Sequence, residues 1–367
     1  MEGEMNKFVK VCLSILASLC YCHFLASKIS TGKLRLISLL PIFFLFAILP
    51  FYLSQVFPTG LIALLFSWLG NFKLLLFAFD KGPLSNHPQR SLFHFIIIAS
   101  LPIKIKENKK HPFLKTPQIH QNSSKKDPKL PLNWPTKVLL FAILAGVHGY
   151  KQKVHPKIVL LLYSCFVYLS IDILFGIAVG VVHATSELEL EPPSDEPYFS
   201  TSLQDFWGKR WNLTVSYLLR HTVYKPVRSF FDDVLGPNWA PLPAVLAAFL
   251  VSGLMHELLF YYITRVSPTW EVTWYFVLQG ACVFVEFGVK RVFSGRVRLH
   301  SAISAALTVG FVVGTAMWLF FPPLLKTGVV EKAIEECETL LDFSKVLSEV
   351  KKNYIIKICI LKYFYGV

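Results

Sequence analysis

The sequence predicts an all-α protein, a polytopic bundle of about seven to nine transmembrane helices. Two observations support this fold class. The 367 residues are 54% hydrophobic with a mean hydropathy of +0.50, and only 16% are charged, against roughly 25% in an ordinary soluble domain. In addition, seven apolar runs reach the length of about 20 residues that a helix needs to cross a bilayer.

These runs divide the chain into its expected elements. The seven long runs occupy residues 8–26, 36–54, 59–79, 157–182, 240–263, 270–289 and 302–321. Two shorter runs, 91–103 and 136–150, suit re-entrant, interfacial or short tilted helices. We therefore predict one polytopic membrane domain over residues 1–350, followed by an atypical C-terminal tail over 351–367.

The charge pattern indicates a membrane-lipid partner rather than nucleic acid. The net charge is +14, but in so apolar a chain we assign it to basic loops that face the cytosol and anionic lipid. The loop 104–134 is the clearest, because its part from 104 to 129 holds eight Lys and two acidic residues. Residues 185–200 hold five acids, and 289–300 are basic; we expect both on the same side.

One ionisable pair stands inside an apolar run, in "SGLMHELLFY" (252–261). Burying His256 beside Glu257 is costly unless the pair has partners or a task. A zinc helix of the form H-E-x-x-H is excluded, because Phe260 occupies the place of the second His. Two interpretations remain for His256: a structural hydrogen bond inside the bundle, or a general base near neutral pH.

The segment "LQDFWGKRWNLTVSYLLRHTVYKPVR" (203–228) mixes aromatic and basic residues with apolar ones. Such a segment suits a membrane interface, where Trp rings and Lys or Arg side chains reach the headgroups. It also suits an anionic ligand such as a nucleotide phosphate. Asn212 begins its more apolar part and offers both a donor and an acceptor. The candidate binding residues are Trp207, Lys209, Arg210, Trp211 and Arg220.

Several other chemistries are excluded by missing motifs. No two of the eleven His lie within six positions, so box-type di-iron sites are not expected. No G-x-S-x-G nucleophile elbow occurs, and the seven Cys form no C-x-x-C. We therefore expect no metal site. Asp172, His183 and Glu286 also lie in or near apolar runs, and we interpret them as packing or interface groups.

Two stretches carry a family resemblance: "DFWGKRWNL" (205–213) and "SGLMHELLFYYITRVSPTWEVTWYF" (252–276). Both resemble the plant wax synthase branch of the membrane-bound O-acyltransferases, the long-chain-alcohol O-fatty-acyltransferases. The likeness extends through "NFKLLLFAFDKGPLS" (71–85) and "WLFFPPLLKTGVVEKAI" (318–334), whereas the tail departs from it. It implies the fold of that superfamily, residence in the endoplasmic reticulum membrane, and acyl transfer from fatty acyl-CoA to a long-chain alcohol.

The resemblance also implies roles for residues. By motif match, His256 is the catalytic His and Asn212 its companion. His256 would take the proton of the alcohol, while Asn212 donates a hydrogen bond to the developing oxyanion. Because a thiolate leaves readily, a covalent acyl-enzyme is not required. We expect acyl-CoA as co-substrate and no cofactor. Its phosphates and adjoining groups would meet Trp207, Lys209, Arg210, Trp211 and Arg220.

Two alternatives remain open at this stage. An acyltransferase of the same branch that uses a sterol or another lipid alcohol would share these motifs, because the discriminating contacts line an apolar pocket. A transporter or a non-catalytic membrane scaffold belongs to another class. Transporters often contain internal repeats with matching broken helices, and the sequence has no such pairing.

Overall fold

The computed structural model describes most of the chain. The described residues are 2–85, 91–106, 134–186, 188–293, 300–336 and Thr339. Most of the predicted basic loop, from 107 to 133, lies outside the described residues, and so does the predicted tail 351–367. The regular secondary structure of the described part is helical apart from two strands of two residues each, which confirms the all-α prediction.

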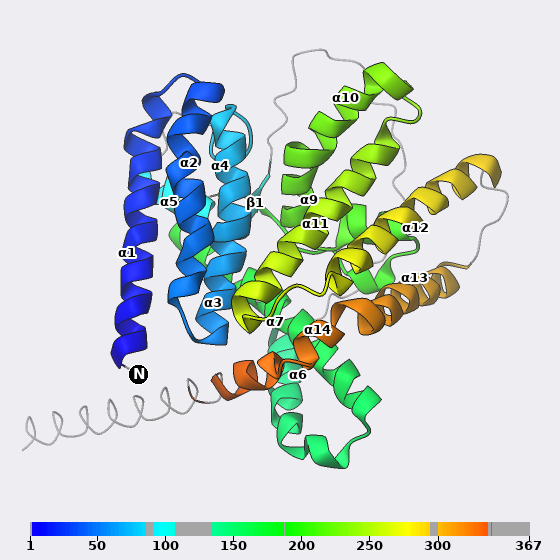
Figure 1. Cartoon of the computed structure of the whole chain (residues 1–367). Helices are drawn as coiled ribbons and strands as arrows, with labels where there is room; N and C mark the ends of the chain where they lie inside the picture. The colour runs from blue at the N-terminus through cyan, green and yellow to red at the C-terminus, as the bar shows by residue number, and fades with distance from the viewer. Residues whose placement is uncertain are drawn as a thin grey trace, which may run out of the picture.

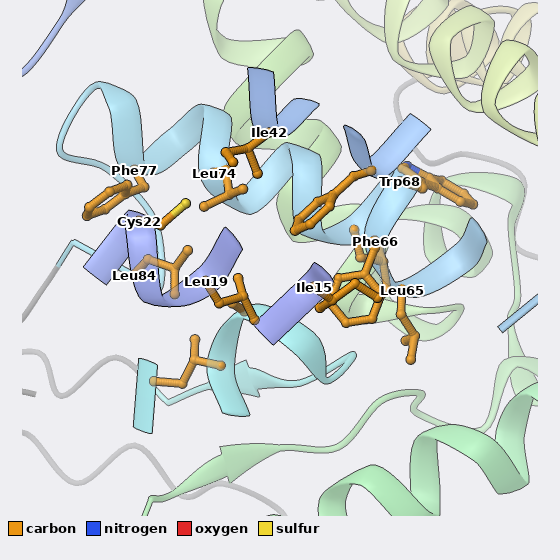
Figure 2. Packing of buried hydrophobic residues seen from close by; sticks show 14 of the residues in the cluster. Ile15, Leu19, Cys22, Ile42, Leu65, Phe66, Trp68, Leu74, Phe77 and Leu84 are labelled. Carbon is orange, nitrogen blue, oxygen red and sulfur yellow. The ribbon is translucent and has the colours of Figure 1, made fainter. Parts of the chain in front are cut away.

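The N-terminal third forms a bundle of helices that stand side by side at one edge of the molecule (Figure 1). Its elements are α1 (Glu2–Phe24), η1 (Ala26–Lys28), α2 (Lys33–Ile48), η2 (Leu49–Tyr52), α3 (Val56–Ile62), the π-helical η3 (Ala63–Gly70), α4 (Asn71–Ala78) and α5 (Leu92–Ser100). Figure 2 shows the core between them, where Leu19 and Cys22 of α1 lie near Leu74 and Phe77 of α4. Trp68 lies at the edge of this cluster, which places it toward the rest of the protein.

A second group of helices completes the molecule. Its elements are α6 (Trp134–Val147), η4 (His148–Lys153), α7 (Pro156–Thr185), η5 (Pro197–Phe199), α8 (Leu203–Asp205), the π-helical η6 (Phe206–Arg210), α9 (Leu213–Leu219), the π-helical η7 (Arg220–Tyr224), α10 (Lys225–Leu235), α11 (Pro241–Thr264), α12 (Glu271–Phe293), α13 (Ser301–Thr315), the π-helical η8 (Ala316–Phe320) and α14 (Pro322–Leu325). In Figure 1, α9 to α13 lie beside the first bundle, and α6 and α14 lie below them.

The seven long apolar runs are confirmed as helices. Among the described residues, those long and apolar enough to cross a membrane are Gly3–Lys28, Lys33–Tyr52, Val56–Ala78, Lys157–Thr185, Pro241–Thr264, Glu271–Lys290 and Ser301–Phe320. The short run 91–103 contains α5, whose nine residues are too few to span a bilayer. The run 136–150 contains most of α6, a shorter apolar helix. The described part therefore has seven candidate spans, the lower end of the predicted range.

A small two-stranded sheet joins two of the predicted loops. Strand β1 (Lys104–Ile105) pairs antiparallel with β2 (Leu190–Glu191), so that Lys104 lies opposite Glu191. The Lys104 Nζ lies 2.5 Å from the Glu191 Oε2. The start of the basic loop is thus paired with the acidic segment.

Close packing of α11 against α12 explains the acid beside His256. A Cβ on Gly253 would lie 2.9 Å from the Thr273 Cα, so the two helix backbones approach within contact distance there. The buried Glu257 points across this contact, and its Oε1 accepts a hydrogen bond from the Thr273 amide at 3.1 Å. Thr273 lies in the first turn of α12, where a carboxylate satisfies a free amide and complements the helix dipole.

One buried cation has a comparable structural role in the first bundle. Lys73 of α4 is fully buried, and its Nζ donates to the carbonyl oxygens of Ile98 at 2.7 Å and Leu101 at 2.5 Å. These carbonyls belong to the C-terminal end of α5, where no further helical turn provides a donor. Lys73 therefore attaches α5 to α4, which fixes the start of the chain that leads to β1.

Candidate active site

A cavity of about 1010 Å³ lies between the two groups of helices. One face of α11 lines it, through Val245, Ala248, Phe249, Ser252, His256, Leu259, Phe260 and Ile263. Because a helix rises 1.5 Å per residue, the stretch from Val245 to Ile263 is about 27 Å long. His256 lies about 10 Å from the Ile263 end, so the cavity extends beyond this residue in both directions.

Aromatic rings surround the His256 imidazole. The ring stacks on Phe276 of α12, with centroids 4.5 Å apart and an angle of 29° between the planes. Trp68 and Phe320 pack edge-on against it at centroid distances of 4.9 and 5.6 Å. Three elements from different parts of the chain, η3, α12 and η8, thus hold one imidazole in the wall of the cavity.

The protonation of the His256 ring follows from its hydrogen bond. Nδ1 lies 2.7 Å from the backbone carbonyl oxygen of Ser252, one turn earlier in α11. A carbonyl oxygen only accepts, so Nδ1 carries the hydrogen and donates it. In a neutral ring, Nε2 then carries the lone pair. The geometry therefore suits a group that accepts a proton through Nε2.

Asn212 lines the same cavity, although 44 positions separate it from His256 in the sequence. Its φ is +41°, a left-handed conformation that Asn tolerates better than most residues. Its Oδ1 accepts from the Val215 amide at 3.1 Å and caps the N-terminus of α9. Within the described part of the chain, no hydrogen bond engages Nδ2, so the amide donor is available to a ligand.

Trp207 also lines the cavity and is fixed by a buried polar chain. Its indole Nε1–H donates to the Oε1 of Gln279 at 3.1 Å. Gln279 is fully buried, and its Nε2 donates to the Thr315 Oγ1 at 2.8 Å. We did not identify Gln279 from the sequence; its signal was a lone amide in the apolar run 270–289.

Trp211 lines the cavity one turn away from Trp207. Its ring stacks on Phe206 at a centroid distance of 5.9 Å and on Tyr168 of α7 at 5.7 Å. Both Trp residues thus line the cavity, and both are held by packing inside the protein. Their rings contact other helices, Trp211 on Tyr168 of α7 and Trp207 on Phe249 of α11.

The three cations predicted from the sequence separate into two groups. Arg220 lines the cavity. Arg210 lies outside its lining, because its guanidinium binds the Asp205 carboxylate at 2.8 Å and the Asp195 carbonyl oxygen at 3.1 Å. Lys209 is exposed and also lies outside the lining. The structure thus brings together Trp207, Trp211, Asn212, Arg220 and His256.

Further polar groups that we did not single out lie near Arg220. Lys104, Glu191 and His221 line the cavity as well. The Lys225 Nζ lies 2.8 Å from the His221 Nε2, which adds a further cation beside this part of the lining. The cavity end formed by β1, β2 and η7 is therefore polar, with a positive charge that comes from Arg220 and Lys225 because Lys104 is paired with Glu191. The end formed by α3 and the chain after α14 is apolar.

Two of the other polar residues in or near the spans, Glu286 and Asp172, have structural contacts. The Glu286 Oε2 accepts from the Leu203 amide at 2.8 Å and holds the start of α8. Asp172 of α7 pairs with Lys137 of α6 at 2.7 Å. His183 is exposed in the last turn of α7. In the described parts of the chain, no three His, Cys, Asp or Glu side chains form a group that would hold a metal ion.

Comparison with known proteins identifies the family of the chain. Residues 190–278, which include Trp207, Asn212 and His256, match the membrane bound O-acyl transferase family. The chain is 43% identical over 350 residues to a probable long-chain-alcohol O-fatty-acyltransferase 1 of Arabidopsis thaliana, covering 95% of this chain and 99% of that protein.

Two further relatives show the same breadth. The long-chain-alcohol O-fatty-acyltransferase of Simmondsia chinensis is 42% identical over 94% of this chain and 97% of its own length. An acyl-CoA–sterol O-acyltransferase 1 of Arabidopsis thaliana is 42% identical over 90% of this chain and 94% of its own length. With its seven candidate spans, the chain is a multi-pass membrane protein. It belongs to the membrane-bound O-acyltransferase family, in the branch of the plant long-chain-alcohol O-fatty-acyltransferases.

Proposed function

We propose that the protein transfers a fatty acyl group from acyl-CoA to a long-chain alcohol, forming a wax ester and CoA. One observation carries the proposal most directly: His256 and Asn212 line a single long cavity that is cationic at one end and apolar at the other. Such a cavity suits an anionic donor with a long acyl chain together with an apolar alcohol. The similarity to long-chain-alcohol acyltransferases supports the same reaction.

In the proposed reaction, His256 acts as the general base. Its Nε2 takes the proton of the alcohol hydroxyl while the alcohol oxygen attacks the thioester carbonyl carbon. The tetrahedral intermediate then collapses, the carbon–sulfur bond breaks, and the thiolate of CoA leaves. The imidazolium returns its proton to the thiolate, so that the products are an ester and CoA in thiol form. The Ser252 carbonyl keeps Nε2 as the accepting nitrogen throughout.

Asn212 stabilises the oxyanion in this scheme. Its Oδ1 is held by the Val215 amide, so Nδ2 has a fixed direction before substrate binds. A donor that is already oriented stabilises developing charge without reorganising during the reaction. Because the same residue caps α9, its position depends on the helix start rather than on a flexible side chain.

The donor nucleotide lies at the cationic end in this proposal. Arg220 receives a phosphate of CoA, with Lys104 and His221 beside it in the lining. Lys209 is exposed on the adjoining turn and is available for an outer contact. Arg210 supports this region indirectly, through its ion pair with Asp205. No cofactor takes part in the scheme, and the proposed residence is the endoplasmic reticulum membrane.

A sterol acyltransferase is the second candidate. The specific support is the acyl-CoA–sterol O-acyltransferase 1 of Arabidopsis thaliana, which matches this chain at 42% identity. The chemistry at His256 and Asn212 would be the same for both acceptors. The two functions differ only in the shape of the apolar part of the cavity, because a sterol is a rigid fused-ring body and a fatty alcohol is a flexible chain.

Expression in a host without wax esters and sterol esters tests the proposal. The host receives either fatty alcohol or sterol, and mass spectrometry identifies the esters. We expect wax esters from the unchanged protein, none from His256→Ala, and normal amounts from His183→Ala, a matched substitution of an exposed His that lies outside the cavity lining. Sterol esters alone would favour the second candidate. Ester formation by a stably inserted His256→Ala protein at the normal rate would rule out the general base.

A further inference from the structure

The apolar end of the cavity is lined in part by a helical segment near the C-terminal side of the described chain. Residues 329–336 are helical and follow Gly328, whose φ of +68° turns the chain back after α14. Val329, Val330 and Ala333 from one face of this segment line the cavity. We call residues 329–336 the end segment.

A carboxylate attaches the end segment to α3. The Glu336 Oε1 accepts from the Val56 amide at 2.7 Å, and its Oε2 accepts from the Phe57 amide at 2.8 Å. Both amides belong to the first turn of α3, where they have no helical acceptor and where the helix dipole favours negative charge. Val56 and Phe57 also line the cavity, so one side chain joins two parts of its end wall.

Small residues leave space at the apolar end of the cavity. Ala333 is the smallest lining residue of the end segment, beside the packed side chains of Val329 and Val330. Gly60 of α3 also lines the cavity, and a Cβ there would lie 3.4 Å from the Ile263 Cγ2. The space available to the end of a bound alkyl chain thus depends on the small side-chain volume at Ala333 and Gly60.

The end wall stands at a set distance from the candidate catalytic imidazole. His256 and Ile263 lie on one rigid helix, seven residues and about 10 Å apart. Gly60 lies against Ile263, and Val56 and Phe57 lie one turn earlier in the same helix α3. A chain that reacts beside His256 and extends this way therefore meets the end segment after a limited length.

We propose that Ala333 determines how long an unbranched alkyl chain the cavity accepts beyond His256, and that Glu336 holds the end segment in place. The proposal rests on the proposed acyl transfer. The alkyl chain is either the acyl chain of the donor or the chain of the alcohol, because both are unbranched hydrocarbon. Each methylene that no longer fits reduces the relative use of a substrate about fourfold, the value of one buried methylene.

The experiment is a competition assay with purified full-length protein in lipid vesicles. One arm offers a mixture of acyl-CoA chain lengths with a single alcohol, and the other offers a mixture of alcohols with a single acyl-CoA. In Ala333→Phe, we expect the ester profile to move to shorter alkyl chains in one of the two arms. The arm that changes shows whether the acyl chain or the alcohol occupies the apolar end of the cavity. Lys332→Phe adds the same ring at the adjoining exposed position and should keep the normal profile.

The role of Glu336 is tested with a matched pair of neighbouring acids. Glu336→Gln loses the charge and one of the two acceptors, so we expect the end wall to loosen and the profile to broaden toward longer chains in the same arm. Glu335→Gln makes the same chemical change at an exposed position and should leave the profile unchanged.

Ala333→Leu replaces Ala333→Phe if the larger ring prevents insertion into the membrane, and we then expect a smaller shift of the ester profile toward shorter chains.

The outcomes separate this inference from the proposed function. If the unchanged protein forms esters and both Ala333 variants insert and react with its chain-length profile, the inference is wrong and the proposed function stands. A loss of rate that is equal at every chain length also contradicts the inference. If the unchanged protein forms no ester from any acyl-CoA and alcohol, the proposed function fails, and the inference fails with it.

Discussion

The indole of Trp207 and the side-chain amide of Gln279 are joined by a hydrogen bond of 3.1 Å between Nε1 and Oε1. Gln279 extends this contact to the Thr315 Oγ1 at 2.8 Å, so a fully buried amide connects the cavity wall with α12 and α13. Phe276, three residues earlier in α12, stacks on the His256 ring. One helix therefore orients both the wall and the imidazole.

Replacing Gln279 with Leu should weaken both the fold and the site. The Trp207 N–H would lose its acceptor in a buried position, which costs about 1–3 kcal/mol. We expect a lower temperature of thermal inactivation and a higher KM for substrate. Thr315→Val is the control, because it removes only the hydrogen bond between Gln279 and Thr315 and should have the smaller effect. Equal effects of the two variants would show that the Trp207 contact has no separate importance.

Asn212→Asp should separate the structural and chemical roles of this residue. The Asp carboxylate retains an acceptor for the Val215 amide, so α9 keeps its cap. It lacks the Nδ2 donor and places negative charge beside the developing oxyanion. We expect kcat to fall by about two to three orders of magnitude while the inactivation temperature changes little. The matched control is Asn238→Asp, at an exposed loop position outside the cavity. A normal kcat in Asn212→Asp would remove Asn212 from the mechanism.

Arg220→Ala should raise the KM for acyl-CoA with little change in kcat. A hydrogen bond to a charged group is worth about 1.5–3 kcal/mol, which corresponds to roughly a tenfold or larger change in affinity. The measurement is initial rate against acyl-CoA concentration at low and high salt. Arg228→Ala is the control, because Arg228 pairs with Asp232 on α10 and lies outside the cavity lining. Equal KM values for the two variants would place the donor phosphates elsewhere.

Gly253→Ala tests the close approach of α11 and α12. The added methyl group would lie 2.9 Å from the Thr273 Cα, so the helix backbones must separate. We expect a loss of about 1–3 kcal/mol in stability. The readout is the fraction of monodisperse protein after heating in detergent. Gly310→Ala adds the same methyl group to α13 in open space and should not destabilise the protein. A heat-stable Gly253→Ala protein would contradict the packing.

Hydropathy predicted the seven spans because each is a continuous apolar run, and such a pattern is local. The grouping of Asn212 with His256 followed from the family resemblance, and the structure places both in one cavity. Membership of an acyltransferase family also separates the chain from the transporter and scaffold hypotheses.

The remaining contacts depend on tertiary structure, so no local pattern predicted them. Arg210 resembled a phosphate ligand, but the fold of η6 brings it to Asp205. The partner of Glu257 is a backbone amide 16 positions later, and that of Glu336 lies about 280 positions earlier. Partners of this kind leave no spacing rule in the sequence, because a main-chain N–H is present at almost every residue.

The acceptor that orients the His256 ring is part of the main chain, one turn earlier in the same helix. No side-chain replacement at position 252 deletes that carbonyl oxygen, and any helical residue there supplies it equally well. The orientation of the proposed proton acceptor is therefore insulated from changes in the surrounding cavity wall. Side chains in that wall can therefore differ between relatives while the orientation of this His is kept.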